Sequence, residues 1–96
     1  MHNALLSPAR IARLFARITR PAAASKASHL VYRLAHRAGL AKQLEARRLY
    51  ALSDALNEHR HVLLAGFRGD AKAVSEHLEN RADLVRLATH PVKRAA

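Results

Sequence analysis

The chain has 96 residues, which suits one small domain with a modest core. Lys and Arg number 17 against seven Asp and Glu, and the formal net charge is +10. The chain has no cysteine and no run of about 18 apolar residues, so the sequence excludes a disulfide framework and a cysteine-based zinc site, and argues against a transmembrane helix.

The composition also predicts the fold class. Alanine, leucine and arginine dominate, whereas glycine and proline number only three each. Such a composition favours helices over strands. We therefore expect an all-α fold, a single domain built as a small bundle of three to four helices joined by short turns.

Charge is placed very unevenly along the chain. Residues 1–44 carry eight Lys or Arg and no acid, whereas all seven acids lie in residues 45–96. A surface this one-sided attracts anions, such as nucleic-acid phosphates, anionic lipid headgroups or an acidic protein. Composition alone does not choose among these partners.

The first predicted helix is amphipathic and basic. Ser7 is its expected N-cap, Pro8 its first residue, and Pro21 its end. One side carries an apolar stripe at i, i+3, i+4, i+7 spacing, formed by Ile11, Leu14, Phe15 and Ile18. The other side carries Arg10, Arg13, Arg17 and Arg20. Three interpretations stay open: a helix of the domain, an organelle-targeting segment within residues 1–24, or a helix on a membrane surface.

A short linker over residues 20–25 is expected next, followed by a helical core over residues 25–90. Ser25 would cap the second helix, and Gly39 would close it in the left-handed conformation with Leu40 folded back onto the apolar face. That face is predicted to consist of Ala27, Leu30, Val31, Leu34 and Ala38.

Residues 34–40 resemble the turn of a helix-turn-helix DNA-binding unit. Ala35 and Gly39 fit that turn, but Glu45 and Arg48 stand where the unit has buried apolar residues. An ordinary helical hairpin is therefore the alternative.

The second half of the core predicts two further helices. One begins near Ala41 and runs to about Ala65, and a turn over residues 66–70 follows. Asp70 is the expected N-cap of a last helix over residues 71–88. Its inner face is predicted to be Val74, Leu78, Val85 and Ala88, with Leu84 and Leu87 alongside. Residues 91–96 are expected to be a basic tail.

Residues 58–78 resemble the closing helical hairpin of the ligand-binding domain of FadR-type, GntR-like transcription regulators. The residues that carry the likeness are Glu58, His59, Arg60, Val62, Leu63, Ala65, Gly69, Asp70, Ala73, His77 and Leu78. The resemblance implies a regulatory role. The histidine of the final helix often binds metal in that family. His77 lies about one helical turn before the position that this histidine takes in the family, so the resemblance does not extend to the metal site.

A second resemblance is to the small arginine-rich bacterial proteins with a YjiS-like domain. It rests on Arg47, Arg48, Leu49, Leu52 and Asp54, and the Asp-Ile-Gly signature of those proteins is missing.

The seven histidines form no metal-binding motif. The chain has neither H-E-x-x-H nor two histidines four residues apart, and only His59 with His77 could form a composite site across the Gly-Asp turn. We expect histidines on the surface or facing phosphate, with no metal and no cofactor. Ser53 and Asp54 beside His59 do not make a triad by spacing, and no glycine-rich phosphate loop is present, so we predict no enzymatic activity.

These observations favour a small basic protein that binds nucleic acid, DNA or RNA, mainly through phosphate contacts. The expected contact residues are Arg10, Arg13, Arg17, Arg20, Arg33, Arg37, Lys42, Arg47 and Arg48. The alternative is a protein-interaction or assembly subunit whose stripe of Ile11, Leu14, Phe15 and Ile18 docks on an acidic protein, another partner or a second copy. A membrane surface is a weaker candidate, no small-molecule substrate is inferred, and the expected compartment is the cytoplasm unless residues 1–24 direct the chain to an organelle.

Overall fold

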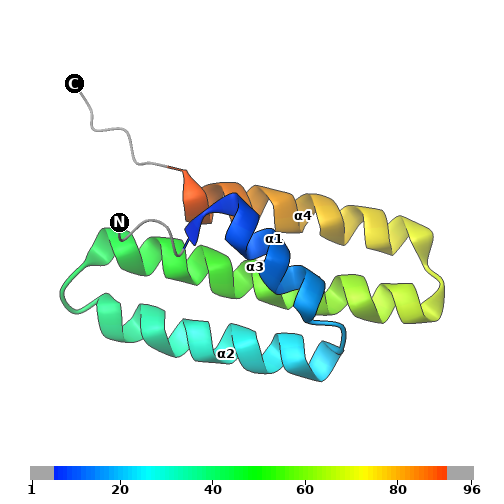
Figure 1. Cartoon of the computed structure of the whole chain (residues 1–96), viewed down its shortest axis with the longest axis horizontal. Helices are drawn as coiled ribbons and strands as arrows, with labels where there is room; N and C mark the ends of the chain where they lie inside the picture. The colour runs from blue at the N-terminus through cyan, green and yellow to red at the C-terminus, as the bar shows by residue number, and fades with distance from the viewer. Residues whose placement is uncertain (1–5, 91–96) are drawn as a thin grey trace.

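The computed structural model describes residues 6–90, which form four α-helices and, within that range, no strand (Figure 1). The helices are α1 (Pro8–Arg17), α2 (Pro21–Ala38), α3 (Gln43–Arg68) and α4 (Ala71–Thr89). The long α3 lies in the middle, with α2 along one side and α4 along the other (Figure 1). The short α1 crosses over α3 on one face of this layer (Figure 1). The prediction of a small all-α bundle is confirmed.

Two predicted helix starts are confirmed by their caps. Ser7 precedes α1, and its hydroxyl accepts a hydrogen bond from the Arg10 N–H at 3.2 Å. Asp70 precedes α4, and its carboxylate accepts one from the Ala73 N–H at 3.0 Å. Each cap satisfies a backbone donor that has no partner within the helix.

The predicted linker over residues 20–25 is wrong. Helix α1 ends at Arg17, and α2 already begins at Pro21, so Ser25 lies inside the helix and caps nothing. The reason is that proline at the first helical position has its φ preset for the helix and loses no hydrogen bond there. The three alanines that follow it are the best helix formers.

The turn between α2 and α3 also differs from the prediction. Gly39 is right-handed, with φ −58° and ψ −21°, and Leu40 points into solvent with 89% of its surface exposed. Hydrogen bonds from the N–H groups of Ala41 and Lys42 to the carbonyl of Ala38 close the turn instead. Helices α2 and α3 then run side by side and antiparallel (Figure 1). They form an ordinary helical hairpin and do not cross at the steep angle of a helix-turn-helix.

The second turn is shorter than predicted because α3 continues unbroken through Gly66 and Phe67 to Arg68. The left-handed residue is Gly69, with φ +73°. The Gly69 N–H bonds to the Gly66 carbonyl and the Asp70 N–H to the Ala65 carbonyl, which is the pairing of a Schellman motif.

Small side chains hold α2 against α3. Ala24 and Ala35 are fully buried, and Ser28 and Ser53 exchange hydrogen bonds, each hydroxyl donating to the other's carbonyl at 2.7 and 2.8 Å. The predicted inner face of α2 is therefore wrong in part. Leu30 and Leu34 are more than half exposed, because alanine and serine allow a closer approach to α3 than leucine would.

The hydrophobic core joins α1, α3 and α4. Its buried members are Ile11, Phe15, Ala51, Leu52, Ala55, Leu56 and Ala88, and Leu6, Leu14, Ile18, Ala27, Val31, Leu84 and Val85 pack around them. On α4, Leu78 and Leu87 are exposed, contrary to the prediction that they line or flank its inner face. None of the helices in residues 6–90 combines the length and apolarity that crossing a membrane requires.

Candidate nucleic-acid interface

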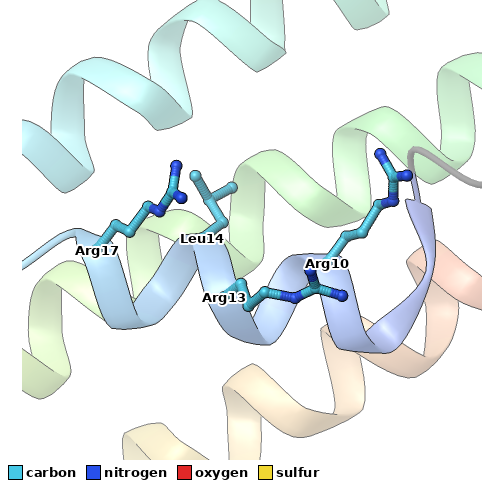
Figure 2. A pocket seen from close by; sticks show the side chains of 4 residues that line it. All are labelled: Arg10, Arg13, Leu14 and Arg17. Carbon is cyan, nitrogen blue, oxygen red and sulfur yellow. The ribbon is translucent and has the colours of Figure 1, made fainter.

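Three of the predicted arginines lie in a row on α1. Arg10, Arg13 and Arg17 are exposed and, together with Leu14, line an open hollow of about 450 Å³ (Figure 2). Spacings of three and four residues place them on neighbouring turns of one side of the helix. None of the three guanidinium groups forms an ion pair with a carboxylate of residues 6–90. We call this group the α1 arginine row.

The opposite side of α1 is buried. Ile11 is 2% exposed and Phe15 7% exposed, both in the hydrophobic core, while Leu14 and Ile18 pack partly against it. The stripe predicted as an interaction face thus packs within the protein, where it buries the apolar face of the layer formed by α2, α3 and α4. Ile11 and Phe15 therefore cannot contact a partner while α1 stays docked, whereas Leu14 is partly exposed beside the arginines.

A cluster of His59, Arg81, Phe15 and the Ile18 carbonyl, which we call the latch, holds the C-terminal end of α1 against α3 and α4. The His59 ring stacks on Phe15 with centroids 4.9 Å apart, and its Nε2–H donates to the Ile18 carbonyl at 2.7 Å. The Arg81 guanidinium lies 4.4 Å from the Phe15 centroid and donates to His59 Nδ1 at 2.8 Å. Residues from α1, α3 and α4 therefore meet at one point.

The protonation state of His59 follows from its two partners. A carbonyl only accepts, so Nε2 carries the hydrogen and the lone pair of Nδ1 faces Arg81. Burial lowers the pKa of His59, the positive charge of Arg81 lowers it further, and the hydrogen bond to Ile18 opposes both. The latch therefore requires a neutral imidazole.

Sequence reasoning missed this latch and placed histidines on the surface, whereas His59 is 5% exposed. The available signal was its position, three residues after Leu56 and four after Ala55, on the buried side of α3. Nothing local in the sequence links Arg81 to His59, because the two residues lie 22 positions apart.

A second basic group lies on α2. Arg33 and Arg37 are exposed and, with His29, Tyr32, His36 and Leu40, line a hollow of about 560 Å³. None of its lining residues is acidic, and neither arginine pairs with a carboxylate of the described residues. We call this the α2 groove.

The other four predicted contact residues line neither hollow. Arg20 and Arg47 are exposed, and Lys42 pairs with Glu45 at 3.9 Å on the surface. Arg48 is half-buried, and its guanidinium donates to the His90 carbonyl at 3.3 Å, which ties the start of α3 to the end of α4. The predicted site is therefore two separate groups, with Arg48 in a structural position.

The histidine pair considered for a metal is not brought together. His59 faces α1, whereas His77 stacks on His61 at 4.9 Å and bonds to Glu58 at 2.8 Å. Burial raises the pKa of Glu58, but its hydrogen bonds with His77 and Asn80, together with the electrostatic attraction of His77 and His61, outweigh burial, so the net shift of the pKa is downward. In residues 6–90, no three histidines or carboxylates are arranged to hold a metal ion.

Comparison of the chain with protein-family models, curated proteins and solved structures found no match. The likenesses to FadR-type regulators and to YjiS-like proteins therefore stay predictions. The structure shows that residues 58–78 do form part of a helical hairpin, with the Gly69–Asp70 turn between its helices.

Proposed function

We propose that this protein binds nucleic acid, mainly through contacts with the phosphate backbone. The observation that carries the proposal is the α1 arginine row: three exposed guanidinium groups on one side of a helix, unpaired by any described carboxylate. Arginine suits this role because its planar fork donates two parallel hydrogen bonds to a phosphate.

The spacing of the row fits a backbone of repeated phosphates. At about 1.5 Å of rise per residue, Arg10 and Arg17 lie on the order of 10 Å apart along α1. One strand of a duplex presents a phosphate about every 3.4 Å along its axis. The row can therefore contact several phosphates of one strand without any rearrangement of α1, which the core and the latch hold in place.

Burial of the apolar stripe supports nucleic acid over a membrane surface. A helix that binds a lipid interface inserts its apolar side among the acyl chains. On α1 that side is occupied, since Ile11 and Phe15 lie in the core. Only the charged side of α1 remains for a ligand, and a hydrated polyanion matches it.

The test is a binding titration against duplex DNA with the triple variant R10Q/R13Q/R17Q. We expect the variant to bind at least about tenfold more weakly. The slope of the logarithm of the binding constant against the logarithm of the salt concentration should also be smaller in magnitude by about three, because each phosphate contact releases about 0.9 counterion. The matched control is R68Q/K72Q/R86Q, which removes the same charge from exposed positions at the α3–α4 turn and on α4.

Equal losses in the two variants would mean that only net charge attracts the DNA, and would overturn the α1 site. Recording the mass in solution during the same titration separates nucleic-acid binding from self-assembly. Binding of an acidic polypeptide such as polyglutamate more tightly than DNA would assign the row to an acidic protein instead.

A further inference from the structure

Two hollows meet at Tyr32 on the surface of α2. One is the α2 groove, whose cations are Arg33 and Arg37 and which contains no acid. The other, of about 380 Å³, lies between α2 and α3 and carries Ser25, Asp54 and Asn57. Both hollows share His29 and Tyr32. An aromatic ring therefore separates a cationic surface from a surface of hydrogen-bonding groups.

The ring of Tyr32 is held in place yet half exposed. It meets Tyr50 of α3 edge to face, with centroids 5.5 Å apart and planes at 64°, and 50% of its residue surface is open to solvent. A tyrosine that served only to fill the α2–α3 interface would be covered there, whereas the interface is filled by Ala24, Ala35 and the serine pair. Half of the surface of Tyr32 is thus available to a stacking base, and its contact with Tyr50 limits the side-chain motion that would be lost on binding.

The charges around Tyr32 would orient such a base. Phosphate is attracted to Arg33 and Arg37 and repelled by the carboxylate of Asp54. The edge of a base carries amino and imino donors beside carbonyl acceptors, which match the carboxylate of Asp54 and the amide of Asn57. One nucleotide laid across Tyr32 would thus place each of its parts against groups of complementary chemistry.

We propose that the two hollows together bind one unpaired nucleotide of a single-stranded nucleic acid, with its base stacked on Tyr32 and its phosphates on Arg33 and Arg37. This inference rests on the proposed function and deepens it, since it names the strand state of the ligand. A duplex keeps its bases stacked and paired inside and has no free face to offer, whereas an unpaired base has one.

The experiment compares a single-stranded RNA of about 12 nucleotides with an RNA duplex of the same length, using the full chain. Tyr32→Leu is expected to weaken binding of the single strand about tenfold, the range that base–aromatic stacking gives, and to leave the duplex unchanged. Tyr32→Phe keeps the ring and should bind like the native protein. Phe67→Leu removes an exposed aromatic at the far turn and should also change nothing.

Equal binding of the single strand by Tyr32→Leu and the native protein would overturn the proposal, as would an equal loss for both RNAs. If both RNAs bind and only the α1 variants weaken them, this inference fails while the phosphate proposal stands. If neither RNA binds at about 50 mM salt while duplex DNA does, this inference fails and the phosphate proposal stands. If duplex DNA does not bind either, both fail. If a nucleoside monophosphate binds as tightly as the single strand and loses the same affinity in Tyr32→Leu, the claim that the ligand is part of a strand is overturned. That result would assign the hollows to a free nucleotide.

Discussion

His59 is the side chain that most directly couples α1 to the rest of the protein. Its ring contacts Phe15 and Ile18 of the N-terminal segment and accepts a hydrogen bond from Arg81 of α4. Periodicity along α3 predicts that position 59 faces inward, but not what it meets there. Its partners lie 41 and 22 residues away in the chain, and only the packing of the helices brings them together.

The latch predicts an acid-sensitive stability. The pKa of His59 is lower in the folded protein than in the unfolded chain. As the pH falls below about 6.5, the unfolded chain therefore takes up the proton first, and the stabilisation that neutral His59 contributes is lost progressively toward the folded pKa. Above about pH 6.5 this stabilisation is complete. Urea unfolding between pH 8 and pH 5 should show this loss in the native protein. The window stays above the range in which Glu58 titrates.

His59→Gln supplies the comparison, since an amide can still donate to Ile18 but does not titrate in this range. The variant should be less stable at pH 8, and its pH profile should be flatter than that of the native protein. His36→Gln, on the exposed side of α2, should keep the native slope. Parallel profiles for all three proteins would refute a titrating latch.

At the scale of the elements, α1 is the helix whose position depends on the fewest contacts. It is ten residues long and reaches the core mainly through Ile11 and Phe15. Isolated helices of this length are marginal in water, so the helicity of α1 depends on its docking. The arginine row is therefore presented only while the buried side of α1 stays in place.

Phe15→Ala should cost about 3–5 kcal/mol of unfolding free energy, because it leaves a cavity in the core and removes the ring that His59 and Arg81 contact. Amide exchange over residues 8–18 should become fast before exchange in α3 does. Phe67→Ala is the control: that ring is 72% exposed and its loss should change stability by less than about 0.5 kcal/mol. Similar costs for the two variants would contradict the docking described here.

The α3–α4 turn makes a second prediction at this scale, from two glycines three residues apart. Gly69 has φ +73°, where an L side chain is strained, so Gly69→Ala should destabilise the protein by about 1–2 kcal/mol. Gly66 lies within α3 with open space around a new Cβ, so Gly66→Ala should stabilise it by about 0.5–1 kcal/mol. Thermal unfolding of both variants checks the signs, and a shift in the same direction for both would contradict the helix end at Arg68.

Over the whole molecule, the sequence predicted what depends on local pattern. The all-α class, the two caps at Ser7 and Asp70 and the apolar stripe of α1 follow from spacing and residue type, whereas the sequence left open three or four helices and whether the stripe is buried within the protein. The sequence did not predict which side of α2 faces α3. The choice between Leu30 and Ala35 as the buried residue depends on how closely α3 approaches α2. The basic residues follow one another along the sequence but form two groups in the structure, because the packing of the helices decides which arginines lie together.

The measurement that tests the central claim most directly is the affinity of the native protein for duplex DNA at about 50 and about 200 mM salt. If the three arginines of the α1 row each contact one phosphate, we expect micromolar or tighter binding at the lower salt and a loss of about 40-fold over the fourfold increase. An affinity that does not change between the two salt concentrations, or no binding at the lower one, would contradict phosphate recognition by this protein.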